Sequence, residues 1–196
     1  MKHRIFIAIN LPEDIKETLL DYQNNHQDVP AKWVPRENLH ITAVFIGDAD
    51  DNNLPLLHKT IERATKGYKR FNIGVKSIGY NFSNLGKGGI KVNSIPRMIW
   101  ASGESNKEFI TLCDNLCKTL ANLSGVKIRA ENREIIPHIT LARIKELEWR
   151  RIEPEERPEV EESIEHSFEV GSVELMESIL KKTGPEYKIL ESYKLN

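Results

Sequence analysis

The phrase His-Ile-Thr occurs twice in this chain of 196 residues, at positions 40–42 and again at positions 138–140. Apolar residues flank both copies, which is typical of strands buried inside a sheet. Side chains alternate between the two faces of a strand, so the histidine and threonine of each copy share a face and the isoleucine lies on the other. We therefore expect two internal strands that each present an imidazole and a hydroxyl on one side.

The two halves of the chain repeat the same order of elements. In each half an apolar strand and an amphipathic helix, clearest over residues 106–123, precede the His-x-Thr strand. This echo predicts an α+β fold built as a two-lobed, pseudo-symmetric duplication, with two antiparallel sheets facing a central cleft and helices outside. We expect residues 1–196 to form a single bilobal domain whose shared cleft is lined by both His-x-Thr strands.

The remaining segments are less regular. Residues 81–89 are rich in glycine and asparagine and predict a loop. Residues 146–165 are rich in glutamate, which favours a solvated helix or an insertion. Two strands are expected to close the chain, over residues 168–175 and 187–195.

Composition limits where such a chain works and what it binds. The net charge is −1, so no global positive field attracts nucleic acid, and any RNA must bind locally in a groove. The two cysteines, Cys113 and Cys117, lie four residues apart on the expected helix and indicate a reduced compartment. The apolar run near the N-terminus is too short for a signal peptide or a membrane span. We expect a cytoplasmic monomer that does not contact membranes.

Two imidazoles beside two hydroxyls suit acid-base chemistry on a phosphate. The unperturbed pKa of imidazole, about 6.5, lets one copy be neutral while the other is protonated near pH 7. We expect His40 and His138 to form this pair, and the hydroxyls of Thr42 and Thr140 to donate to phosphoryl oxygens. Such a site needs no metal and no cofactor, because these groups themselves stabilise the charge. A single His-x-Thr is more often a packed pair in a strand, but two copies at matched places favour a functional interpretation.

Three further residues are candidates for substrate contacts. Arg143 shares strand parity with neither His138 nor Thr140, so strict alternation turns it away from the cleft unless a bulge or the strand end redirects it. Phe6 and Trp33 are candidates to stack on a base, although the mid-strand position of Phe6 is more typical of the core. The other four histidines lack a matching threonine and are interpreted as structural or surface residues, at positions 3, 26, 58 and 166.

Several segments together resemble the RNA 2′,3′-cyclic phosphodiesterases, also described as 2′-5′ RNA ligases, of the two-histidine phosphoesterase superfamily. Besides the two His-x-Thr phrases, the matching pieces are RIFIAI at 4–9, WV at 33–34, PRMIWA at 96–101, the AR that ends the second motif at 142–143, and the tail from Val173 to the GPEY at 184–187. The pieces span nearly the whole chain in the family's order.

The resemblance implies metal-independent hydrolysis of a 2′,3′-cyclic phosphate at an RNA end to a 2′-phosphate, with 2′-5′ ligation as a related reverse step. It implies that His40 and His138 are catalytic, that Thr42 and Thr140 hold phosphoryl oxygens, and that Arg143 lines the substrate site. We assign His40 as the acid and His138 as the base on the same ground, and the resemblance favours Phe6 as a substrate contact.

Two other functions are compatible with the same residues. In the first, the chain is a phosphodiesterase whose substrate is another cyclic or 2′-5′ linked nucleotide. In the second, the chain is a catalytically idle module that binds RNA ends. The partners expected are RNA ends or small cyclic nucleotides bound in the cleft. The intact histidine and threonine in both motifs argue against the idle module.

Overall fold

One antiparallel sheet organises the computed structural model, which describes residues 2–82, 95–123, 128, 135–182 and 184–196. The expected loop over residues 81–89 therefore lies largely outside the described residues. The strands run in the order β7-β4-β5-β6-β3-β1-β8-β9, and β2 pairs with β6. Their bounds are β1 Lys2–Asn10, β2 Ala31–Trp33, β3 His40–Asp50, β4 Phe71–Asn81, β5 Met98–Ser102, β6 His138–Ile144, β7 Glu162–Val170, β8 Ser172–Lys181 and β9 Gly184–Lys194.

The sheet consists of two halves that meet where the two His-x-Thr strands touch. One half contains β7, β4, β5 and β6, and the other contains β3, β1, β8 and β9. The two sheets expected from the sequence are therefore joined into one, through the pairing of Ile41 with Ile139. The expected α+β class, with antiparallel strands and peripheral helices, is confirmed, whereas the separation into two sheets is not.

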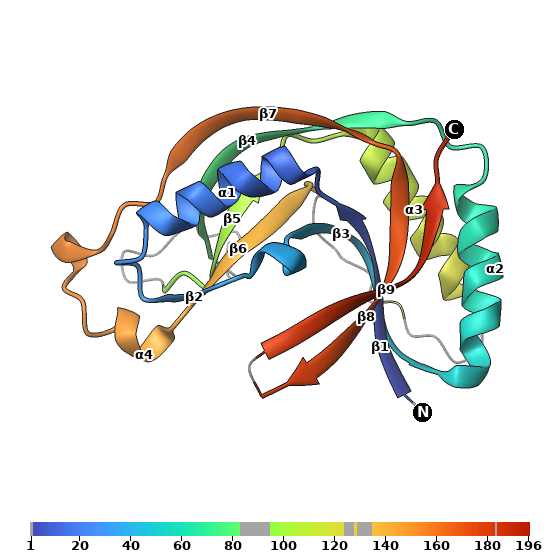
Figure 1. Cartoon of the computed structure of the whole chain (residues 1–196), viewed down its shortest axis with the longest axis horizontal. Helices are drawn as coiled ribbons and strands as arrows, with labels where there is room; N and C mark the ends of the chain where they lie inside the picture. Colours follow the sequence, from blue (N-terminus) through green and yellow to red (C-terminus); the bar gives the residue numbers. More distant parts are fainter. Residues whose placement is uncertain (1, 83–94, 124–127, 129–134, 183) are drawn as a thin grey trace.

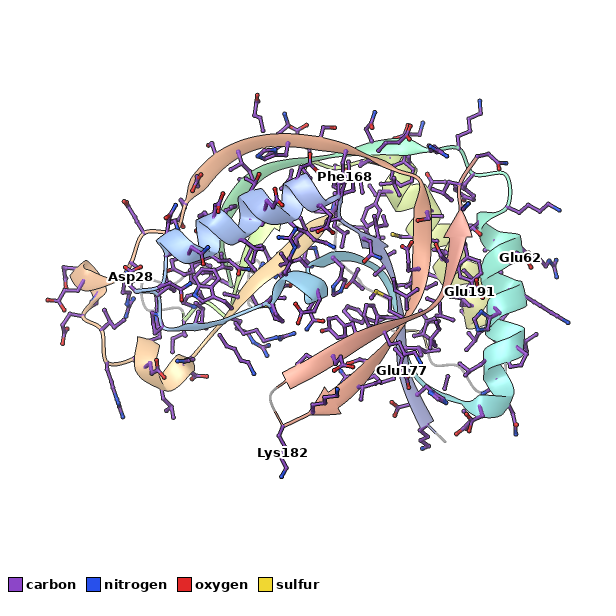
Figure 2. All side chains as sticks on the ribbon, in the orientation of Figure 1. Asp28, Glu62, Phe168, Glu177, Lys182 and Glu191 are labelled. Atoms are coloured by element: carbon purple, nitrogen blue, oxygen red, sulfur yellow. The ribbon has the colours of Figure 1, made fainter. Side chains whose placement is uncertain are left out.

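The two halves of the sheet leave this junction in different directions. Figure 1 shows β4 and β7 arching away from it, while the β8–β9 hairpin projects on the other side. Lys182 lies at the tip of this hairpin, and its exposed side chain extends away from the sheet (Figure 2).

Helices cover the core side of both halves. Helix α1 (Glu13–Asn25) lies over the β6 half, where the Tyr22 hydroxyl donates to Val160 O and the Gln23 amide donates to Leu141 O. Helices α2 (Leu54–Thr65) and α3 (Lys107–Ala121) lie side by side over the β3 half (Figure 1). The side chain of Asn106 accepts a hydrogen bond from Phe109 N and caps α3. No helix of the described residues is long and apolar enough to cross a membrane.

The glutamate-rich segment differs from the expectation. It contains a single-turn helix α4 (Glu146–Trp149) and a 3₁₀ turn, and then enters β7 at Glu162. β7 lies at the edge of the sheet and alternates between its faces: Glu162, Glu165 and Glu169 are exposed, while Ile164, Phe168 and Val170 are buried. The single strand expected over residues 168–175 is wrong, because Gly171 separates β7 from β8.

The backbone of Gly103, directly after β5, passes close to the backbone of β4 next to the second motif. A side chain added at Gly103 would place its Cβ 2.1 Å from Gly74 O, and Gly103 N donates to Pro137 O, directly before His138. We expect Gly103→Ala to lower the free energy of unfolding by roughly 1–3 kcal/mol, since backbone must shift to accept the methyl group. Urea denaturation measures this change. Gly79→Ala on β4 is the control, because its Cβ would meet only Glu161 Cγ at 3.8 Å; equal stability of the two variants would contradict the prediction.

Candidate active site

The pairing of Ile41 with Ile139 sets the geometry of both motifs. In an antiparallel ladder the residues before and after such a pair lie opposite each other in reverse order. His40 therefore lies toward Thr140, and Thr42 lies toward His138. Both isoleucines are buried in the core, so all four polar side chains are on the opposite face of the sheet. The structure thus brings the four residues predicted from the sequence together in a pseudo-symmetric arrangement.

The His40 imidazole is held by two hydrogen-bonding partners. Its Nδ1 lies 2.7 Å from Asn38 O, and because a carbonyl only accepts, Nδ1 carries the proton. Nε2 lies 3.0 Å from Thr42 Oγ1, so the hydroxyl donates to the neutral ring. Burial lowers the pKa of His40 from its usual value of 6.5, and the nearby charge of His138 lowers it as well. The free protein therefore favours a neutral His40.

The His138 imidazole repeats this orientation. Its Nδ1 lies 2.9 Å from Ile136 O, again the carbonyl two residues earlier in the chain. The same tautomer follows, with Nε2 as the nitrogen available to a ligand. The ring also stacks on the indole of Trp100, with centroids 3.8 Å apart and planes 23° apart. Two imidazoles with the same tautomer are thus presented from two neighbouring strands.

A β-bulge decides where Arg143 points. Trp100 pairs with Thr140, but the preceding Ile99 pairs with Ala142, so Leu141 is an extra residue in β6. Arg143 then lies opposite Met98, which shares a face of β5 with Trp100. The bulge therefore turns Arg143 to the face that carries His138, against the strict alternation considered from the sequence. Its side chain is exposed there.

Phe6 lies beneath His40 and not on an open surface. Its side chain is only 4% exposed, and its ring centroid is 5.2 Å from that of His40 and 5.1 Å from that of Tyr187. Tyr187 also meets the His40 ring edge-on at 5.2 Å. These contacts give Phe6 a packing position behind the imidazole and do not fit a base-stacking role. Trp33 likewise packs against the core, near Tyr22.

Three residues that touch the histidines were not predicted as site residues from the sequence. Trp100 packs on the His138 ring, and Tyr187 packs on the His40 ring. Asn38 accepts a hydrogen bond from His40 through its backbone carbonyl, and its side-chain amide donates to Pro185 O. Trp100 and Tyr187 belong to the segments that carried the family resemblance, and the alternation of residues 98–102 predicts the face of Trp100. The contact between Tyr187 and His40 joins distant parts of the chain, so no local pattern predicts it.

Three of the other four histidines have partners away from the two motifs. Carboxylates of Asp51 and Glu177 hold His3 and raise its pKa, while His26 and His58 bond to Tyr22 O and the Tyr193 hydroxyl. Among the described residues, no three His, Cys, Asp or Glu side chains are grouped so that they would hold a metal ion.

Known proteins resemble this chain over almost its whole length. It is 29% identical over 191 residues to an RNA 2′,3′-cyclic phosphodiesterase of Methanocaldococcus jannaschii, covering 97% of this chain and 99% of that protein. It is 30% identical to the RNA 2′,3′-cyclic phosphodiesterase of Thermus thermophilus, covering 98% and 90% of the two chains.

Solved structures share the fold. The crystal structure of the Thermus thermophilus protein TT0787 superposes with a TM-score of 0.80 at 28% identity, covering 98% of this chain and 97% of that one. The Escherichia coli LigT complex with 3′-AMP has a TM-score of 0.76 at 22% identity, covering 100% and 99%. The model of the LigT-like phosphoesterase family matches residues 9–92 and 106–187. With both His-x-Thr motifs inside the matched segments, this chain belongs to the LigT-like phosphoesterase family.

Proposed function

We propose that this chain hydrolyses the 2′,3′-cyclic phosphate at an RNA end to a 2′-phosphate. The observation that carries the proposal is the pair of imidazoles with the same tautomer, each beside a threonine, on either side of the Ile41–Ile139 pair. The proteins named RNA 2′,3′-cyclic phosphodiesterase that this chain matches support the choice of substrate. The whole chain is one bilobal domain, and the cyclic phosphate lies in the cleft between its halves.

Each residue has a defined task in this reaction. One imidazole removes a proton from water through Nε2, the water oxygen attacks phosphorus, and the P–O3′ bond breaks. The other imidazole, protonated on Nε2, donates its proton to the departing O3′. The hydroxyls of Thr42 and Thr140 donate to the phosphoryl oxygens, and Arg143 contacts the phosphate from the end of β6. If a 5′-hydroxyl of RNA replaces water, the same groups serve ligation.

The lowered pKa of His40 bears on the division of roles. In the free protein it makes His40 the neutral ring, which is the state of a base. A bound cyclic phosphate carries a negative charge, and such a charge beside an imidazole raises its pKa again. This charge allows His40 to be the acid in the substrate complex, and the assignment of His40 as the acid and His138 as the base follows the family resemblance.

Loss of either imidazole removes one proton transfer. We expect His40→Ala and His138→Ala each to lower kcat by about 10²–10⁴, the usual contribution of general acid-base catalysis. The measurement is turnover of adenosine 2′,3′-cyclic phosphate in EDTA, with the 2′- and 3′-phosphates separated. Clean formation of the 2′-phosphate by the unaltered protein supports a metal-independent reaction. Substantial turnover by either variant would contradict the paired mechanism, and binding without turnover by the unaltered protein would favour the idle module.

Titration of His40 tests its environment and its role. We expect an NMR midpoint below 6.5 in the free protein, rising in His138→Gln because a positive charge has been removed, yet staying below 6.5 because burial persists. Saturation with adenosine 2′-phosphate should raise the midpoint above its free value. A midpoint that does not move on binding would assign the base role to His40 instead.

Arg143 is expected to act through binding. Arg143→Ala should raise KM about tenfold with a smaller change in kcat, because a charge-assisted contact to the phosphate is lost. Arg143→Lys keeps the charge but not the planar fork, so its KM should lie between those of the unaltered protein and Arg143→Ala. Arg70→Ala is the control, since Arg70 pairs with Glu169 at the far edge of the sheet. A KM unchanged in Arg143→Ala would remove Arg143 from the site.

A further inference from the structure

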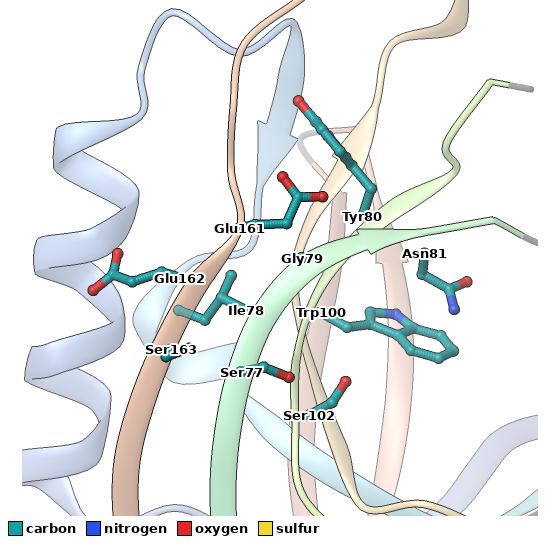
Figure 3. A pocket seen from close by; sticks show the side chains of 10 residues that line it. All are labelled: Ser77, Ile78, Gly79, Tyr80, Asn81, Trp100, Ser102, Glu161, Glu162 and Ser163. Carbon is teal, nitrogen blue, oxygen red and sulfur yellow. The ribbon is translucent and has the colours of Figure 1, made fainter. Parts of the chain in front are cut away.

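A cavity of about 410 Å³ opens beside His138, on the half of the sheet formed by β4, β5 and β7. Its lining includes Trp100, the residue whose indole stacks on the His138 ring. Figure 3 shows Trp100, Asn81, Ser77 and Ser102 projecting to the same side of the strands. The volume falls in the range of small-molecule sites, and the cavity adjoins the phosphate chemistry without being used by it.

Gly79 creates space next to the indole. It lies directly across the ladder from Trp100, so the face that Trp100 occupies on β5 is left open on β4. Glu161 reaches over this opening, since its Cγ would be 3.8 Å from a Cβ added at Gly79. The backbone of Gly79 is not in the left-handed region, so the conformation does not require glycine there. The open space is therefore a feature of the surface and not a by-product of a turn.

The charges around the cavity exclude a second phosphate as its occupant. Glu161 and Glu162 contribute carboxylates to the lining, and Ser77, Ser102 and Asn81 contribute neutral donors and acceptors. A phosphate would meet like charge, whereas a neutral planar base would meet an aromatic wall and hydrogen-bonding groups on its edge. The stack between Trp100 and His138 also puts the cavity next to an imidazole, as a base joined to the ribose of the cyclic phosphate requires.

We propose that the cavity formed by Trp100, Gly79, Ser77, Ser102 and Asn81 binds the nucleobase of the terminal nucleotide while its cyclic phosphate lies between the two histidines. This inference rests on the proposed function and adds the subsite that holds the base. The polar wall formed by β4 and β5, with the carboxylates of Glu161 and Glu162 beside it, takes the base, and the cationic end of β6 takes the phosphate.

The test compares two substrates that differ only in the base. Adenosine 2′,3′-cyclic phosphate carries it, and methyl riboside 2′,3′-cyclic phosphate lacks it. We expect the unaltered protein to show a KM about tenfold lower for the adenosine substrate, as stacking contributes to binding. In Gly79→Val the side chain fills the opening. The KM of the methyl riboside substrate divided by the KM of the adenosine substrate should then fall from about ten to about one. Gly74→Val, on the same strand but outside the lining, should keep the ratio.

A second variant and a binding measurement test the subsite independently of turnover and of the folding of Gly79→Val. Ser77→Val fills the same face from another position and serves if Gly79→Val does not fold. Calorimetric titration with adenosine 2′-phosphate measures binding without turnover: Kd should rise about tenfold in Gly79→Val and stay the same in Gly74→Val. Equal KM values for the two substrates in the unaltered protein, or an unchanged Kd in both filled variants, would overturn the subsite. Absence of turnover with both substrates would instead overturn the proposed function, and the titration would still decide the subsite.

Discussion

The contact between Ile41 and Ile139 is the interaction on which the rest of the site depends. It joins the two halves of the sheet, and both side chains are almost fully buried in the core. Since neighbouring side chains on a strand point to opposite faces, burying these two isoleucines forces the flanking histidines and threonines onto the opposite face of the sheet. A register slip of one residue at this pair would exchange the residues of the two faces on one strand. The apolar core therefore fixes the polar site.

Orientation of the imidazoles comes from the backbone of their own strands. In both motifs Nδ1 donates to the carbonyl two residues earlier, which sets the tautomer and leaves Nε2 for the ligand. What differs is the surroundings of each ring. Phe6 and Tyr187 enclose His40, whereas Trp100 stacks on His138 beside a polar cavity. A pair that is symmetric in sequence thus becomes chemically unequal, which an acid and a base require.

The same inequality extends to the surfaces around the two rings. The β1–β8–β9 half presents the aromatic packing of Phe6 and Tyr187 with Met176, while the β4–β5 half presents serines, Asn81 and carboxylates around Trp100. Arg143 lies on the face that carries the histidines only because the bulge at Leu141 reverses the alternation of β6. In the proposed complex, phosphate and base therefore lie on different surfaces of one fold.

Much of this protein follows from local patterns in its sequence. The alternation around positions 40–42 and 138–140 determines two buried strands with polar side chains on one face, and the repeated order of elements determines the α+β class. Tertiary structure alone decides that the two halves join into one sheet, since a single pair of isoleucines makes the junction. It also decides the bulge that redirects Arg143, the burial of Phe6 and the edge position of β7, where glutamates were expected to form a solvated helix or an insertion. These features depend on partners far away in the chain, and periodicity within a segment carries no information about them.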